Sequence, residues 1–279
     1  MGTDDPDALS QPSLRNAISN AMARIKREFY GKGPSRTRTF ICDRIIFSIL
    51  HDVLTPVEVT FKEAGRSALV RRTRLTFEDI MTRTFIGEIE RLTGARVLAY
   101  HSQIVFDPDM AIEIFVLDQP AHHRDRPAAE AGVRSARLDE PGRVGDADAL
   151  PSAEDRPVLA SRGASPRRPD GQLRSALANA MIRILHEHWG KGPTRAKVYL
   201  EDGFVFCVLE DPLTTIERTL VEAGETDLVR ELRLEFQEVV NRECSEQVET
   251  LTGHRVLACH GQVVFDPDIV FQVFAVEEP

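Results

Sequence analysis

The sequence predicts an α+β protein in which one two-layer α/β sandwich occurs twice. The second half of the chain repeats the first at an offset of 159 residues without insertion or deletion, and about 48 of about 105 paired positions are identical. In each half, the apolar pattern and the turn residues give the order α-β-β-α-α-β-β. Four strands with helices on one face form a two-layer sandwich. Because the second face and the edges of each sheet stay uncovered, we expect the copies to pair as a pseudo-dimer within one chain.

The first helix of each copy ends at a glycine, Gly31 or Gly190, which is the usual residue after a helix C-terminus. Apolar residues precede it at helical spacing, namely Leu14, Ile18, Met22, Ile25 and Phe29 in the first copy and Leu173, Leu177, Met181 and Ile184 in the second. Two strands are then expected, most clearly at 198–200 and 204–208. They lie on either side of Asp202-Gly203, a pair typical of hairpin turns.

The second and third helices follow the strands. Thr55-Pro56 predicts a helix start, because Thr is favoured at the N-cap and Pro at the first helical position. This helix is expected to reach Gly65, and a long helix to run from near Ser67 to Gly94. We expect apolar residues to form the buried stripe of the long helix in both copies: Phe77, Ile80, Met81, Phe85, Ile89 and Leu92, then Phe236, Val239, Val240, Cys244, Val248 and Leu251. Strands at 97–106 and 111–117, joined by an Asp-Pro-Asp turn, complete the first copy.

The repeat predicts domains at 12–118 and 172–279. Residues 119–171 contain no Phe, Tyr or Trp and are rich in Ala, Pro, Arg and Asp. Such a segment buries too little apolar surface to offset the entropy of ordering, so we expect a disordered linker. The His122-His123 pair lies in this segment and has no counterpart in either copy, so we do not expect it to bind a metal.

Composition excludes several classes of protein. The net charge of −9 disfavours a nucleic-acid binder. No apolar run approaches the ~18 residues that a transmembrane helix needs, and residues 1–11 lack the features of a secretory signal. We therefore expect a cytoplasmic protein. The four cysteines share no CxxC spacing and none recurs in the other copy, which favours free thiols over disulfides or a zinc site: Cys42, Cys207, Cys244 and Cys259.

The candidate ligand-binding residues are polar residues that both copies retain, because the duplication acts as an internal alignment. They fall into three groups: Lys32 and Arg36 with Lys191 and Arg195 after the first helix, Arg71 and Arg74 with Arg230 and Arg233 on the long helix, and His101 and Gln103 with His260 and Gln262 on the third strand. We expect them to form an anion-binding or polar site.

The lysine group has a structural alternative. Glycines after a helix can expose backbone N–H groups and a lysine to an anion. However, the Gly31-Lys32-Gly33-Pro34 turn follows a helix, whereas phosphate-binding loops usually precede one. A helix C-cap with a solvated lysine is therefore the alternative.

The arginine and histidine groups also have structural alternatives. Arg71 and Arg74 stand three residues apart and share a helix face. Either could bind an anion, or pair with an acid that both copies retain: Asp52/Asp211, Glu58/Glu217 or Glu63/Glu222. His101 and Gln103 are expected on one strand face together with Val97, Ala99 and Val105. The alternatives are a pair that faces a ligand, a histidine that transfers protons, and a histidine hydrogen-bonded at an interface.

Catalytic chemistry is not expected. No retained Ser or Cys has a neighbouring base at the spacing of an activated nucleophile. No retained His, Cys and Asp cluster suggests a metal site. We therefore predict no catalytic residues, no metal and no cofactor.

Several segments of the first copy, largely retained in the second, resemble one protein family. They are Tyr30-Gly31-Lys32-Gly33-Pro34, Leu54-Thr55 with Glu58, Leu69-Val70-Arg71, Thr93-Gly94 and Phe115-Val116-Leu117. Together they resemble the MpsC family, which is named for a Na+-translocating, membrane-potential-generating system. The resemblance covers both copies, whereas members of that family are mostly small, single-domain cytosolic proteins. Some are encoded beside a pair of membrane subunits implicated in bicarbonate or ion uptake.

The resemblance implies a non-enzymatic accessory or regulatory protein of a membrane ion or inorganic-carbon transport system. Its partners would be membrane transport subunits contacted peripherally, and it would hold a small anion near the retained basic residues. The alternative is a soluble module that senses a small anion or a nucleotide independently of any transporter.

Overall fold

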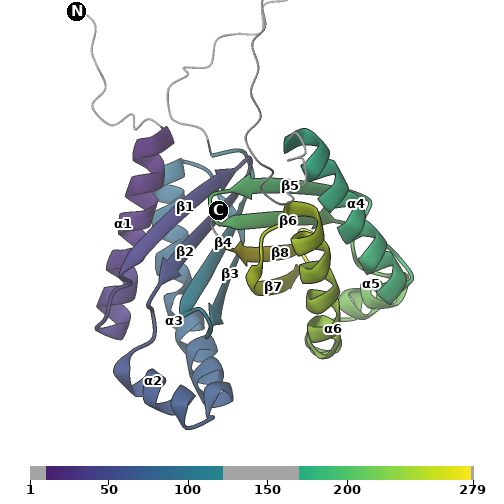
Figure 1. Ribbon diagram of the computed structural model, residues 1–279. Coiled ribbons are helices and arrows are strands. Elements are labelled where there is room, and N and C mark those ends of the chain that lie inside the picture. The colour runs from purple at the N-terminus through teal and green to yellow at the C-terminus, as the bar shows by residue number, and fades with distance from the viewer. Residues whose placement is uncertain (1–10, 122–169, 278–279) are drawn as a thin grey trace, which may run out of the picture. The chain divides into compact units, whose positions relative to one another are not determined.

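The computed structural model describes residues 11–121 and 170–277, and all of them belong to one compact unit. The predicted linker lies almost entirely outside the described residues, as does the His122-His123 pair. The first copy contains α1 (Gln11–Tyr30), β1 (Arg36–Cys42), β2 (Ile45–His51), α2 (Pro56–Glu63), α3 (Ser67–Thr93), β3 (Val97–Val105) and β4 (Met110–Leu117) (Figure 1). The second copy contains α4 (Asp170–Trp189), β5 (Arg195–Glu201), β6 (Phe204–Glu210), α5 (Thr215–Glu222), α6 (Thr226–Thr252), β7 (Val256–Val264) and β8 (Ile269–Val276).

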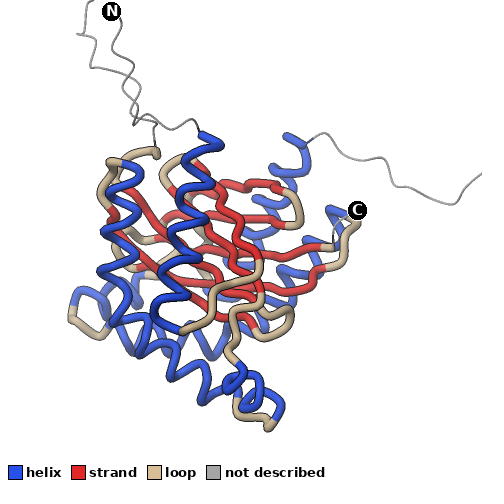
Figure 2. The backbone as a smooth tube through the Cα atoms, turned by 90° about the vertical axis from the view of Figure 1, so that its left-hand side faces the viewer, coloured by secondary structure: helices blue, strands red, loops and turns tan. Residues whose placement is uncertain are grey.

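Each copy forms one antiparallel four-stranded sheet, with strand orders β1-β2-β4-β3 and β5-β6-β8-β7. Helices α1 and α3 cover one face of the first sheet (Figures 1 and 2), and α4 and α6 cover one face of the second. The predicted element order and fold class are confirmed. In both sheets the third strand in sequence, β3 or β7, lies at an edge.

Local sequence signals fix the helix ends as predicted. Thr55 is the N-cap of α2, and its hydroxyl accepts from the Glu58 backbone N–H while the Glu58 carboxylate accepts from the Thr55 N–H. This reciprocal capping box satisfies N–H groups that a helix start leaves unpaired. Gly94 ends α3 with a φ of 68°, in the left-handed region that favours glycine.

The two sheets pack against each other through the faces that carry no helices. A single apolar cluster joins the copies and includes Phe40, Phe47, Ile112, Phe206 and Phe271. Phe47 and its counterpart Phe206 stack with ring centroids 4.3 Å apart. The order of layers is therefore helices, sheet, sheet, helices, and the expected pseudo-dimer forms through sheet faces. A separated copy would expose this apolar face to water.

The buried stripe of the long helix differs from the prediction in its first half. Met81, Phe85 and Ile89 are buried as expected, but Ile80 is 64% exposed and Phe77 is also exposed. In the second copy, Val240, Cys244 and Val248 are buried, whereas Phe236 and Val239 are exposed.

Helical geometry explains the correction. Residues spaced three or four apart trace one face of a helix, and the face that contains Met81 and Phe85 continues backwards through Glu78, Arg74 and Val70, all of which are buried. Two of these three residues are charged, so the apolar pattern of the sequence predicts burial of Phe77 and Ile80 instead. The side chains of Arg74 and Glu78 thus both lie inside the protein.

One strand-face prediction also needs correction. Ala99 and Val105 pack against the core between the sheets, whereas Val97 packs against the helix-side core. The pairing of β3 with β4 shifts register between Val97 and Ala99. Such a bulge inserts one residue and reverses the alternation of side chains before it. His101 therefore shares the sheet-side face with Ala99 and Val105 but not with Val97.

Candidate functional site

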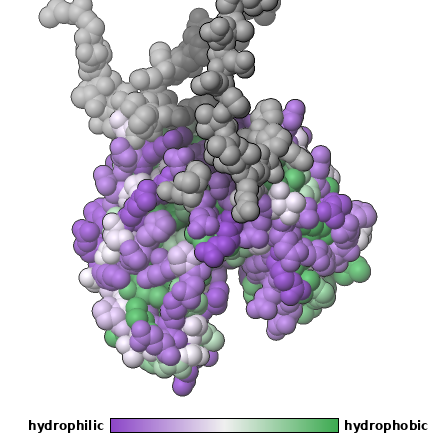
Figure 3. Space-filling model, viewed as in Figure 1, coloured by the Kyte–Doolittle hydropathy of each residue, from purple (hydrophilic) through white to green (hydrophobic). Residues whose placement is uncertain are grey.

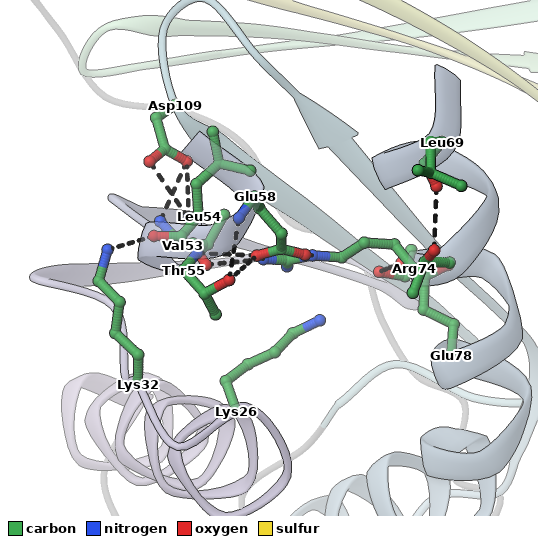
Figure 4. A network of polar contacts seen from close by, with 12 residues as sticks. Lys26, Lys32, Val53, Leu54, Thr55, Glu58, Leu69, Arg74, Glu78 and Asp109 are labelled. Atoms are coloured by element: carbon green, nitrogen blue, oxygen red, sulfur yellow. Dashed lines mark hydrogen bonds and ion pairs between the residues drawn. The ribbon is translucent and has the colours of Figure 1, made fainter. Parts of the chain in front are cut away.

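The retained arginine Arg74 holds α2 against α3. Its Nε donates to Glu58 Oε1 at 2.6 Å and one terminal nitrogen donates to Glu58 Oε2 at 2.7 Å (Figure 4). The same nitrogen donates to the Val53 carbonyl, and the guanidinium lies over the Tyr30 ring. Burial alone would raise the pKa of Glu58, but hydrogen bonds from Arg74 and Thr55 outweigh it, so this pKa lies below its ordinary value.

The second copy repeats this arrangement. Arg233 donates to both Glu217 oxygens, at 2.6 and 2.8 Å, and to the Pro212 carbonyl. Its guanidinium lies over the Trp189 ring, 4.4 Å from the centroid. Of the three retained acids considered from sequence, Glu58 and Glu217 are the partners. A bidentate, buried pair of this kind gives both arginines a structural role.

The retained lysines also make structural contacts. Lys32 Nζ donates to the Leu54 carbonyl at 2.6 Å (Figure 4), and Lys191 donates to the Leu213 carbonyl in the same way. Each contact ties the turn after the first helix to the loop that precedes the second. Arg36 and Arg195 lie on exposed positions of β1 and β5, and Arg195 pairs with Glu210 at 3.3 Å.

A cleft of about 1020 Å³ brings the other retained residues together. Residues of both copies line it, chiefly from α3, β3, α6 and β7, and Figure 3 shows a hollow between the surfaces of α3 and α6. The predicted site residues that line it are Arg71, His101, Gln103, Arg230, Arg233, His260 and Gln262. Lys32, Arg36, Arg74, Lys191 and Arg195 lie outside its lining. The cleft is the candidate functional site.

The two histidines of the cleft are uncharged at neutral pH. Burial, and then the charge of Arg230, lowers the pKa of His101 to about 4. Burial, then Arg71 and His101, lowers the pKa of His260 to about 3. The pKa of each histidine is thus lowered by the charge of the arginine from the other copy. The four side chains therefore lie around one shared space. Neutral imidazoles offer one donor and one acceptor each.

The two arginines of the cleft present guanidinium groups beside aromatic rings. Arg71 lies over Phe106, 5.4 Å from the centroid, and Arg230 lies over Phe265 at 5.5 Å. Arg230 also pairs with Asp227 at 2.7 Å. Within residues 11–121 and 170–277, no acid forms an ion pair with Arg71. A guanidinium with free donors is suited to carboxylate, phosphate or carbonate oxygens.

An ionic cluster in the first copy was not predicted. Lys26 Nζ lies 2.8 Å from Glu113 Oε1 with both side chains buried, although the angle is not that of a hydrogen bond. Tyr100 donates to Glu113 Oε2 at 2.7 Å, and Ser102 donates to Glu78 Oε1 at 2.8 Å. Burial, and then the charge of Glu113, raises the pKa of Glu78 to about 7. Glu78, Tyr100 and Ser102 line the cleft.

The second copy replaces every member of this cluster, so retention in both copies cannot reveal it. At the offset of 159, the counterparts are Leu185 for Lys26, Gln237 for Glu78, Cys259 for Tyr100, Gly261 for Ser102 and Gln272 for Glu113. Two signals in the sequence could have found it. Lys26 follows Met22 by four residues within the apolar stripe of the first helix, and Glu113 interrupts an apolar strand.

The cysteines are free thiols, and three of the four are buried. Cys259 lines the cleft, where burial raises its pKa far above the ordinary value, so the thiol stays protonated. In the part of the chain that the structure describes, no three His, Cys, Asp or Glu residues are grouped to hold a metal ion. No described helix is long and apolar enough to cross a membrane.

Comparison with known proteins places the chain. The family model described as "Na+-translocating membrane potential-generating system (MpsC)" matches residues 10–119 and again residues 169–278. The chain belongs to the MpsC family. It is also similar to YrhF, an uncharacterized protein of Bacillus subtilis (strain 168), with 23% identity over 104 residues; this stretch is 37% of the chain and 85% of YrhF. No solved structure matches the chain. The MpsC match thus covers both copies, and YrhF corresponds in length to one.

Proposed function

We propose that this member of the MpsC family is a non-enzymatic accessory or regulatory protein of a membrane ion or inorganic-carbon transport system. It would contact the membrane subunits peripherally and respond to a small anion held in the cleft between the copies. The name of the family supports the link to ion translocation and membrane potential.

One observation carries the choice of site. Arg71, His101 and Gln103 and their second-copy counterparts line a single cleft, although they come from halves of the chain 159 residues apart. Arginine donors beside uncharged histidines and carboxamides suit an anion that accepts hydrogen bonds. Because the copies share the cleft, a bound anion would also bridge them and could transmit its presence to a partner protein.

The histidines and the thiol of the cleft favour binding over catalysis, and Glu78, whose pKa of about 7 would suit a general base, has no counterpart in the second copy. A general base works best with a pKa near the operating pH, whereas the pKa values of His101 and His260 are lowered to about 4 and about 3. The one thiol in the lining, Cys259, is protonated because burial raises its pKa. These groups are better suited to hydrogen bonding than to proton transfer or nucleophilic attack.

A deletion and complementation experiment tests this proposal. We expect deletion of the gene to lower ion or bicarbonate uptake, or membrane potential, and the wild-type chain to restore it. The combined variant Arg71→Ala/Arg230→Ala should not restore it, whereas Arg36→Ala, which changes an arginine outside the cleft, should. Affinity purification with the membrane subunits provides the second readout. The proposal is wrong if deletion leaves uptake and membrane potential unchanged and no membrane subunit is recovered by affinity purification.

The second candidate is a soluble sensor of a small anion or nucleotide that works without a transporter. The volume of the cleft, about 1020 Å³, favours it because this is the size of sites for small organic ligands. Thermal-shift screening with bicarbonate, phosphate and nucleotides separates the two. Stabilisation that depends on Arg71 and Arg230, together with normal uptake in the deletion strain, would favour the sensor.

A further inference from the structure

We propose that the second copy contains a binding pocket for the base of a nucleoside or nucleotide, an uncharged planar group with hydrogen-bond donors and acceptors side by side. The pocket is the part of the cleft that extends between α6 and β7. It is bounded by the polar side chains Gln237, Asn241, Cys259 and Gln272 and by the apolar wall of Leu185, Trp189 and Val240.

The cleft reaches deeper into the second copy than into the first. Its lining includes Leu185, Val240, Val270 and Gln272, which belong to α4, α6 and β8. The counterparts of these four residues in the first copy do not line it, although the fold is the same: Lys26, Met81, Ala111 and Glu113. The difference must therefore arise from side chains.

Two aromatic residues fill this space in the first copy. Tyr100 stacks on Phe115 with centroids 4.8 Å apart and lies 5.5 Å from Phe85. The second copy has Cys259 in place of Tyr100 and Cys244 in place of Phe85. Two rings are thus replaced by two small side chains, which opens space behind β7.

A glycine makes the opening polar. A Cβ atom at Gly261 would lie 2.8 Å from the Gln272 amide nitrogen and 3.2 Å from Asn241 Oδ1, so both carboxamides would have to shift from their present positions. The carboxamides of Gln272 and Asn241 therefore approach the backbone of β7 only because residue 261 has no side chain. The first copy has Ser102 at this position, with its hydroxyl bonded to Glu78.

An unpaired polar atom points to a ligand. Asn241 Oδ1 is buried without a hydrogen-bond partner among the described residues. A buried polar atom without a partner is unfavourable, and a ligand that bonds to it removes this cost. Gln272 Oε1 accepts only a long contact from Cys259 Sγ, at 3.6 Å.

The chemistry of these groups selects the ligand. The carboxamides carry no charge, and the thiol stays protonated at neutral pH because burial raises its pKa. Carboxamide oxygens and nitrogens match a ligand edge that carries hydrogen-bond donors and acceptors side by side, as nucleobases do. Trp189 and Leu185 add an apolar wall for a flat ring.

The base could come from a free nucleoside or from a nucleotide. Arg71 and Arg230 line the same cleft and would then hold the phosphate, and this part alone rests on the proposed anion site. The base pocket itself does not depend on the arginines. The two proposals can therefore fail separately.

Calorimetric titration of the full chain with the four common ribonucleosides, their 5′-monophosphates and inorganic phosphate tests the pocket. We expect at least one nucleoside to bind once per chain. Gly261→Ser, which introduces the first-copy residue, should weaken binding at least tenfold, and Asn241→Ala should do so without adding volume. The matched control Gly87→Ser adds the same side chain outside the cleft lining, where a Cβ would meet no atom within 4 Å, and should leave the affinity within twofold. Thermal melting establishes whether each variant is folded. If Gly261→Ser does not fold, the affinity of Asn241→Ala decides the test.

The outcomes separate the two sites. Failure of every nucleoside and nucleotide to bind, or binding that neither Gly261→Ser nor Asn241→Ala changes, overturns the base pocket. If Arg71→Ala/Arg230→Ala abolishes the advantage of nucleotides over nucleosides, both sites are supported. If nucleosides bind but phosphate and the arginine variant have no effect, the base pocket stands and the anion site fails.

Discussion

In the first copy, the space between α3 and β3 is filled by aromatic rings and by the ion pair of Lys26 with Glu113; in the second, Leu185, Gln272 and two cysteines leave a pocket at the equivalent place. The backbone order, the capping boxes and the buried arginine–glutamate pairs are the same in both. The comparison separates two classes of residue. Those that both copies retain hold the fold and line the shared cleft, whereas those that differ decide which copy can admit a ligand.

The largest loss of stability is expected at the buried arginine–glutamate pairs that both copies retain. Arg74→Ala leaves Glu58 half-buried without its partner, and Arg233→Ala does the same to Glu217. Loss of one member of such a pair costs about 3–5 kcal/mol of unfolding free energy. Urea denaturation measures it, with Arg66→Ala as the control at an exposed position. A cost below about 1 kcal/mol in both copies would show that these pairs do not hold α2 and α5 in place.

The next effect concerns the ion pair that only the first copy has. Glu113→Gln leaves the buried Lys26 ammonium unpaired and should cost about 3 kcal/mol of unfolding free energy. The double change Lys26→Leu/Glu113→Gln introduces the second-copy residues and should bring stability back to within about 1 kcal/mol of wild type, because it leaves neither buried charge without its partner. A double variant as unstable as Glu113→Gln alone would contradict this interpretation.

Glu78 gives the first copy a pH dependence that the second lacks. Its pKa is raised to about 7, so the folded protein binds a proton more tightly than the unfolded chain does. The resulting stability is complete below the ordinary carboxyl pKa and is lost as the pH rises through about 7. The loss is at most about 3 kcal/mol. The free energy of unfolding, measured by denaturation between pH 4.5 and 8, should depend less on pH in Glu78→Gln than in the wild type. An unchanged pH dependence would rule out a buried, protonated Glu78.

The histidines should act in the opposite direction. The pKa of His260 is lowered to about 3, so acid protonates the unfolded chain first and favours unfolding. The stability that depends on neutral His260 is complete above the ordinary pKa near 6.5 and is lost as the pH falls toward 3. The loss between pH 6.5 and 5.5 is about 1 kcal/mol. We expect His260→Gln to remove this loss of stability with falling pH, as measured by thermal melting at each pH. If the variant and the wild type lose stability equally, His260 is not buried in its neutral form.

Much of the fold can be predicted from the sequence because its signals are local. The capping Thr55, the terminal Gly94 and the apolar spacing of α1 depend on near neighbours in the chain. The exposure of Ile80 and the burial of Arg74 could not be predicted in this way. They depend on where α2 lies against α3, and this position is fixed by the long-range pair between Arg74 and Glu58.

The site could be predicted only in part. Retention in both copies identifies Arg71, His101 and Gln103, which the fold brings together with their counterparts in one cleft. The same criterion also selects Lys32, which bonds to the Leu54 carbonyl outside the cleft. It omits Glu78, because a residue that distinguishes the copies cannot be found by what they share.

The most direct test of the account asks whether the two copies form one ligand site. Calorimetric titration of the full chain with bicarbonate, inorganic phosphate and AMP measures both stoichiometry and affinity. The account predicts that at least one of these anions binds once per chain, and that Arg71→Ala/Arg230→Ala weakens it at least tenfold while Arg36→Ala does not. Two equivalent sites per chain, no binding of any of the three, or undiminished binding by the Arg71→Ala/Arg230→Ala variant would contradict it.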